Sequence, residues 1–148
     1  MKKFFFIFVF FIASCGYQPI YLNKSPDNFT FNKITISGNK KINRKIINTA
    51  LFIEDNNSTL KNELLINSNL NIEETSKNSK GQVESLRTVI IVNFIIKDND
   101  QIIKSKNFTK DFAYNNQDNK FKLVEYQKEI ENNILNEIIE EIIMYMNL

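Results

Sequence analysis

The chain contains no histidine and no tryptophan, and among its 148 residues it has one cysteine, two prolines and three glycines. Without histidine it lacks the commonest general base and the commonest nitrogen ligand for transition metals. Three glycines are too few for a glycine-rich loop that cradles a phosphate, and no serine has a recognisable activating base. The sequence therefore predicts a protein without an enzymatic site, a metal or a non-covalent cofactor.

The chain also lacks an excess of one charge. It holds 19 basic and 17 acidic residues, so its formal net charge is +2. A nucleic-acid-binding domain would show a strong basic excess. We therefore expect no nucleic-acid partner.

The first residues have the pattern of a bacterial lipoprotein signal. Two lysines precede an apolar run over 4–13, which is shorter than the roughly 20 residues that cross a membrane. The small residues Ala13 and Ser14 stand immediately before the only cysteine, Cys15. We expect cleavage between Ser14 and Cys15 and a covalent lipid on Cys15. The alternatives are an uncleaved anchor, or an ordinary signal peptide with a chance cysteine.

Residues 15–28 contain both prolines together with asparagine, serine and aspartate. This composition is typical of an extended segment. The predicted organisation is a signal peptide over 1–14, a lipidated tether over 15–28 and a single domain over 29–148.

The hydrophobic pattern of the domain changes period along the chain. Alternating apolar residues predict four strands, over 29–37, 63–75, 85–97 and 101–114. Apolar residues at helical spacing predict two helices, over 42–54 and 120–147. The order is β-α-β-β-β-α. It predicts an α+β domain with one small mixed or antiparallel sheet of about four strands and two helices packed on one face.

The predicted strand over 85–97 is apolar on both faces. Val89, Ile91 and Ile95 share the parity opposite to that of the more continuous apolar set, which begins at Leu86. Two helices cover only one face of a small sheet, so these three residues are a candidate partner interface. The alternatives are that loops or the tether cover them, or that this face holds acyl chains.

The segment Cys15-Gly16-Tyr17-Gln18-Pro19-Ile20-Tyr21 resembles the opening of mature LPS-assembly lipoproteins of the LptE family. The segment over 111–115 and the long final helix are similar to that family as well. The resemblance implies a lipoprotein that is anchored on the periplasmic side of the outer membrane. It would be the plug and chaperone partner of the LPS-translocating β-barrel LptD, and it would contact lipopolysaccharide. Gly16 after the cysteine favours outer-membrane sorting.

Two other functions are compatible with the sequence. One is a periplasmic auxiliary or lipid-binding lipoprotein of another envelope transport system. The other is a small lipoprotein hydrolase, which the absence of histidine disfavours.

Two groups of cations are notable. Lys40, Lys41, Arg44 and Lys45 crowd the start of the first predicted helix, where free amides and positive charge could hold an anion such as an LPS phosphate. A solvated charged turn is the alternative. The second group lies on the last predicted strand, where lysines deter pairing between sheet edges; it comprises Lys104, Lys106 and Lys110.

Overall fold

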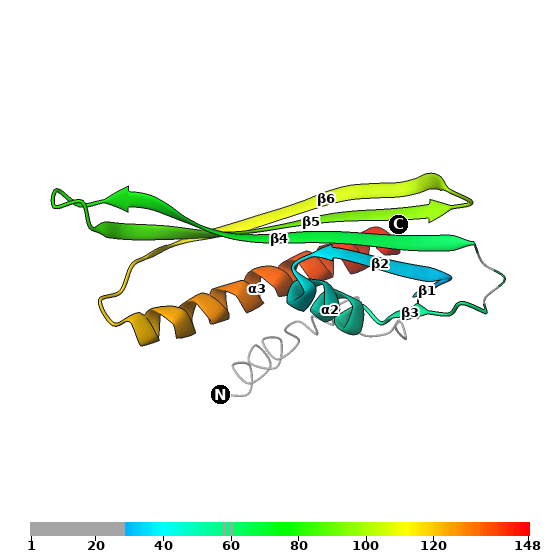
Figure 1. The fold of residues 1–148 in the computed structure, drawn as a ribbon, viewed down its shortest axis with the longest axis horizontal. Helices are drawn as coiled ribbons and strands as arrows, with labels where there is room; N and C mark the ends of the chain where they lie inside the picture. The colour runs from blue at the N-terminus through cyan, green and yellow to red at the C-terminus, as the bar shows by residue number, and fades with distance from the viewer. Residues whose placement is uncertain (1–28, 58, 60) are drawn as a thin grey trace, which may run out of the picture.

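The computed structural model describes residues 29–57, 59 and 61–148 (Figure 1). The expected signal peptide, Cys15 and the tether therefore lie outside the described residues. The strands are β1 (Phe29–Phe31), β2 (Lys33–Gly38), β3 (Phe52–Glu54), β4 (Asn62–Lys77), β5 (Val83–Asp98) and β6 (Gln101–Asn115). The helices are α2 (Lys40–Thr49) and α3 (Lys120–Met146).

The main sheet has the strand order β2-β4-β5-β6. β2 runs parallel to β4, and the other neighbours are antiparallel. Both helices lie on the same side of this sheet (Figure 1). The α+β class, the mixed four-stranded sheet and the two helices on one face are thus confirmed.

Alternation along β5 separates two faces of the sheet. Its even-numbered residues Ile90, Val92 and Phe94 are fully buried beneath the helices. The helices contribute their own apolar stripes, and on α3 Ile134 and Ile138 belong to the same core. We call this side of the sheet the inner face and the opposite side the outer face.

The beginning of the domain differs from the prediction. The strand expected over 29–37 is two strands, and the helix expected over 42–54 ends at Thr49. Leu51 adopts a left-handed conformation (φ 56°), which stops the helix. The chain then forms β3, which pairs with β1 as a separate parallel sheet.

Aromatic packing explains why the chain turns back as β3. The ring of Phe52 lies 5.7 Å from that of Phe31 and 5.8 Å from that of Phe94, measured between centroids. The three rings join the small sheet to the inner face of the main sheet. Ile53, which helical spacing would bury, is 43% exposed.

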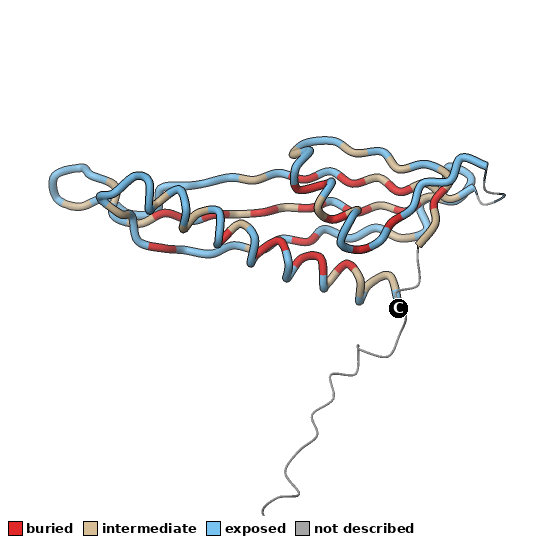
Figure 2. Tube along the Cα trace, turned by 90° about the horizontal axis from the view of Figure 1, so that it is seen from below, coloured by how far each residue is buried: buried red, intermediate tan, exposed pale blue. Residues whose placement is uncertain are grey.

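The molecule is elongated because β4, β5, β6 and α3 are long. α2, β1 and β3 lie toward one end, which we call the proximal end (Figure 1). Buried residues are concentrated in the proximal half of the sheet (Figure 2). The β4–β5 turn lies at the opposite, distal end (Figure 1). Of the two described helices, only α3 extends beneath the distal end of the sheet (Figure 1).

Candidate interaction surfaces

Val89, Ile91 and Ile95 lie on the outer face, and all three are half-buried. Neighbouring strands flank each of them in register: Ile91 lies between Asn69 and Thr109. No element of the described residues covers this face (Figure 1). The structure therefore places the predicted interface residues together, on the side of the sheet that the helices leave free.

The centre of the outer face carries no charged side chain. Ser37, Asn67, Asn93 and Asn107 form one row in register across all four strands. A neighbouring row, on the proximal side of the first, consists of Thr35, Leu65, Ile95 and Ser105.

These two rows, together with Ile66 and Lys106, line a shallow hollow of about 320 Å³. The asparagine row could not be predicted, because the three asparagines come from separate strands and only the register aligns them. Their amide side chains take no part in the hydrogen bonds of the described residues. The face therefore offers uncharged donors and acceptors beside exposed apolar groups.

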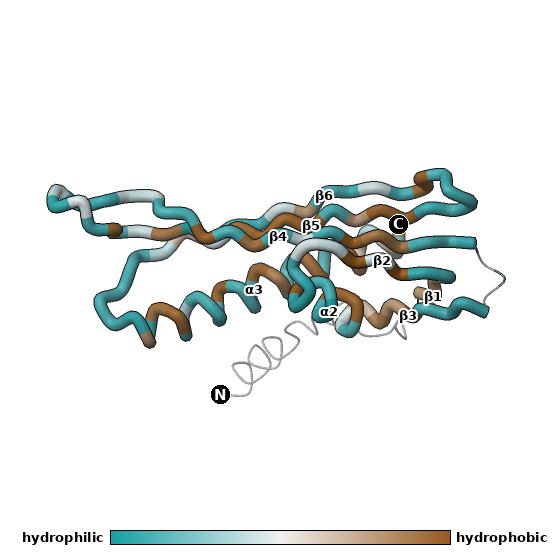
Figure 3. The backbone as a smooth tube through the Cα atoms, in the orientation of Figure 1, coloured by the Kyte–Doolittle hydropathy of each residue, from teal (hydrophilic) through white to brown (hydrophobic). Residues whose placement is uncertain are grey.

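Hydrophilic and hydrophobic residues both occur along the strands of the main sheet (Figure 3). On the outer face, apolar and uncharged polar side chains share the centre. Charges lie only toward its ends. Glu63 and Lys97 are in register near the proximal end. Toward the distal end, the Arg87 guanidinium lies 3.5 Å from the Asp111 carboxylate.

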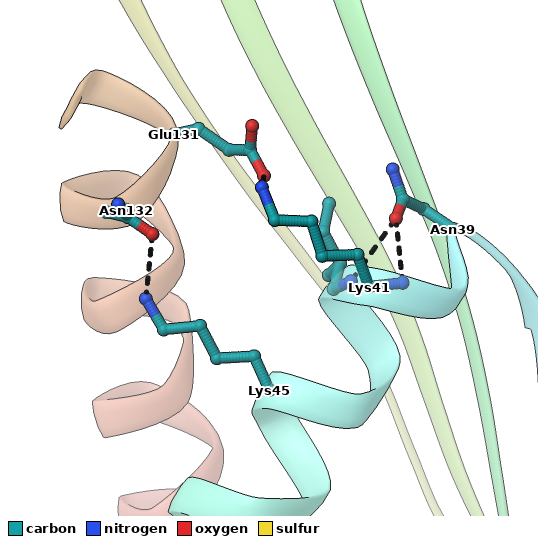
Figure 4. A network of polar contacts seen from close by, with 6 residues as sticks. Asn39, Lys41, Lys45, Glu131 and Asn132 are labelled. Atoms are coloured by element: carbon teal, nitrogen blue, oxygen red, sulfur yellow. Dashed lines mark hydrogen bonds and ion pairs between the residues drawn. The ribbon is translucent and has the colours of Figure 1, made fainter. Parts of the chain in front are cut away.

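The basic cluster at the start of α2 serves in part to join the two helices. Lys41 Nζ lies 3.0 Å from Glu131 Oε1, and Lys45 Nζ donates to Asn132 Oδ1 at 3.1 Å (Figure 4). Both partners belong to α3. These two ammonium groups therefore already have partners within the protein.

The first amides of α2 are occupied as well. Asn39 Oδ1 accepts from the backbone N–H groups of Lys41 and Ile42 at 3.1 and 3.2 Å (Figure 4). Lys40 and Arg44 are exposed, and no ion pair of the described residues includes them. Of the predicted anion site, only these two cations have neither an ion pair nor a side-chain hydrogen bond within the described residues.

The lysines of β6 turn toward α3. Lys110 Nζ lies 2.7 Å from Glu141 Oε1 and 3.7 Å from Glu137 Oε2. The hydrogen bond to Glu141 and the charge of that carboxylate raise the pKa of Lys110 above its usual value of 10.5. Lys104 Nζ donates to the Tyr145 carbonyl at 3.4 Å. These lysines therefore pack against the helix instead of standing out over the edge of the sheet.

Within residues 29–57, 59 and 61–148, no three acidic or cysteine side chains gather closely enough to hold a metal ion. None of the helices in the same ranges combines the length and the apolar character that crossing a membrane requires. The surfaces described above are suited to binding by shape, hydrogen bonds and apolar contact.

No protein-family model matches the chain, and neither does any curated protein. Several solved structures share its fold. Lipoprotein B from Nitrosomonas europaea is 12% identical with a TM-score of 0.56, over 85% of this chain and 88% of that one. Rare lipoprotein B from Shewanella oneidensis is 12% identical with a TM-score of 0.53, over 77% and 92%.

A lipoprotein from Caulobacter crescentus is 11% identical with a TM-score of 0.51, over 76% of this chain and 85% of that one. At these identities the likeness shows a common fold. The chain thus has a fold that is found among bacterial lipoproteins.

Proposed function

We propose that this protein is a non-catalytic lipoprotein of the outer membrane that assists LPS assembly. In this proposal a lipid on Cys15 anchors it on the periplasmic side. Its domain would act as plug and chaperone partner of the translocation barrel LptD and would contact lipopolysaccharide.

Two independent features support an envelope lipoprotein. The first is the signal pattern that ends at Cys15 and continues into the LptE-like segment over 15–21. The second is the fold, which is similar to those of rare lipoprotein B and lipoprotein B over most of each chain. The first feature rests on residues outside the domain and the second on the domain itself.

The observation that carries the partner assignment is the outer face, which no described element covers and which carries charged side chains only toward its ends. Val89, Ile91 and Ile95 are half-buried there beside a row of asparagines. The core of a protein interface is depleted of charged residues, and the interior wall of an outer-membrane barrel is polar. A neutral face with amide groups and scattered aliphatic side chains is complementary to such a wall.

The test is a pair of variants. Ile91→Glu puts a charge in the centre of the outer face, whereas Val124→Glu puts the same charge on α3, at a residue that is 49% exposed. We expect Ile91→Glu to lower the yield of barrel that co-purifies in mild detergent at least about tenfold, because the interface would bury an unpaired charge. Val124→Glu should leave the yield unchanged.

Circular dichroism of both variants must match the wild type for this comparison to count. If Ile91→Glu retains the barrel at wild-type yield, the outer face is not the interface. A yield that falls equally in the two variants would also contradict the assignment, since it would show no preference for this face.

A lipid-binding function is the second candidate, and one observation favours it. At the distal end a hollow of about 550 Å³ lies between the β4–β5 turn and the start of α3, with Val83, Leu123 and Val124 in its lining. Its size falls in the range of small-molecule sites. This candidate predicts that Val124→Glu, rather than Ile91→Glu, lowers the amount of lipid that is extracted with the protein.

A further inference from the structure

We propose that the free edge of β6 between Asn107 and Ala113 binds one extended strand of another polypeptide. That strand would carry an acidic residue opposite Lys106 and an apolar residue opposite Phe112. The proposal does not depend on the barrel partner, because the edge and the outer face are different surfaces of the sheet.

β6 is the last strand in the sheet order, and no strand of the described residues lies beyond it. The Asn116 amide donates to the Glu84 carbonyl at 2.8 Å, which fixes the phase of the antiparallel ladder between β5 and β6. In such a ladder, residues that bond to the neighbour alternate with residues that turn their main-chain groups away. The groups that face the open edge belong to Asn107, Thr109, Asp111 and Ala113.

The proximal part of the edge is closed by α3. The Tyr145 hydroxyl donates to the Ser105 carbonyl at 3.4 Å. This carbonyl also points to the open edge, because Ser105 is two residues before Asn107 on the strand. The open length is thus about seven residues, from 107 to 113. This is enough for a β-strand of ordinary length.

The other free edges are poorer templates. β2 is a strand of six residues, and a short edge strand is itself a protection against pairing. β4 continues past β2 after Ser68, but its register shifts between Glu74 and Ser76 and again before Lys77. Such bulges interrupt the regular row of donors and acceptors. The open length of β6 has no register shift, because the only one between β5 and β6 lies at Ile96/Lys97.

Cations at the β6 edge do not block an added strand. Lys106 Nζ lies over two rings, 4.7 Å from the centroid of Phe108 and 5.3 Å from that of Tyr145. None of the ion pairs of the described residues includes Lys106, whereas Lys110 is already paired with two glutamates. An acidic side chain opposite Lys106 would therefore meet a positive charge that has no carboxylate partner.

The second recognition point is apolar. Phe112 is on the same face of β6 as Lys106 and is 48% exposed. The two positions are six apart in the sequence, with five residues between them. The strand that fits best therefore has an apolar residue and an acidic residue six positions apart, on the same face.

A second copy of this chain fits less well. Antiparallel self-pairing over the whole of 107–113 would be centred on Lys110. It would bring together two clusters that each consist of Lys110, Glu137 and Glu141. Each cluster has one cation and two carboxylates, and like charges directly opposite each other are destabilising. The chemistry therefore favours a different polypeptide.

The test uses the full chain in detergent micelles and a synthetic peptide. Every second residue of the peptide is threonine, so that threonines form one face. The other face has a valine to lie opposite Phe112 and, six positions later, a glutamate to lie opposite Lys106. Thr109→Pro removes a donor that faces the open edge without removing a bond to β5. Its matched control, Thr109→Ala, keeps that donor.

We expect Thr109→Ala to bind the peptide as the wild type does and Thr109→Pro to bind it about tenfold more weakly or worse. Lys106→Glu should weaken binding about two- to fivefold, and a peptide with lysine in place of glutamate should then bind better than the original. Hydrogen exchange should show new protection of the amides of 107, 109, 111 and 113 when the peptide binds.

Equal binding by Thr109→Pro and Thr109→Ala would overturn the proposal, and so would an absence of binding at millimolar peptide. If Thr109→Pro fails to fold, a peptide whose edge-facing amides are methylated takes its place and must lose affinity for the wild type. Concentration-dependent dimers that Thr109→Pro abolishes would show that the edge binds a second copy instead.

Discussion

At the scale of single residues, the turn from β2 into α2 is held by several close contacts. Gly38 has a φ of 76°, and a side chain there would collide with the carbonyl oxygen of Ser68. The Asn39 amide donates to that same carbonyl at 2.8 Å. Asn43 is fully buried and donates to the Ser37 carbonyl at 2.6 Å. These contacts fix where the chain leaves the sheet and begins the helix.

Comparing Gly38 with Gly81 separates the cost of a left-handed backbone from the cost of a steric collision by an added side chain. Gly81 has nearly the same φ, 77°, but a side chain there would meet no atom within 4 Å. We expect Gly81→Ala to lower the free energy of unfolding by about 1 kcal/mol through the left-handed conformation alone. Gly38→Ala should cost several times as much, because the β2–α2 turn must also move away from Ser68. Urea denaturation of the two variants measures the difference, and equal midpoints would contradict it.

At the scale of elements, periodicity predicted the long strands and the long helix well. β5 and α3 lie within about two residues of their predicted limits, because both carry an apolar pattern over many residues. The short elements were missed for a physical reason. β3 has only three residues, and its Phe52 is buried by rings from β1 and β5 that are distant in sequence.

The candidate surfaces also divide into those that a local sequence pattern predicts and those that depend on contacts between distant elements. The apolar second face of β5 is a local pattern, so the sequence was sufficient to single out Val89, Ile91 and Ile95. The asparagine row and the open edge of β6 depend on register between strands. The partners of Lys41 and Lys45 depend on how α2 crosses α3. Sequence patterns do not contain these relations between elements.

The apolar stripe of α3 gives a prediction at this scale. Ile134 is 5% exposed in the core, whereas Asn136 is exposed on the opposite side of the helix. Ile134→Asp would bury an unpaired charge and remove apolar contacts, at a cost on the order of several kcal/mol. We expect it to unfold the domain, while Asn136→Asp melts within a few degrees of the wild type. Matching melting curves for the two variants would show that this stripe does not hold the helix to the sheet.

At the scale of the whole molecule, the core is concentrated at the proximal half and the distal end is a long, thinly covered extension (Figure 2). The described core draws its residues from α2, from α3 and from strands of both sheets. We therefore expect folding of the domain and attachment to a membrane to be separable properties of the chain.

This separation makes a prediction for Cys15→Ser. We expect the variant to lose incorporation of a palmitate analogue and to leave the membrane fraction, while its circular-dichroism spectrum and melting temperature stay unchanged. Under the proposed function, the lipid on Cys15 also raises the effective concentration of the domain near its barrel.

Cys15→Ser should therefore lower co-purification of the barrel without abolishing it, whereas Ile91→Glu acts on the interface itself. If the two effects are independent, the yield of the double variant equals the product of the two single fractional yields. Equal labelling of Cys15→Ser and the wild type would disprove lipidation at this residue. A double variant no weaker than Ile91→Glu alone would show that tethering contributes nothing to the binding.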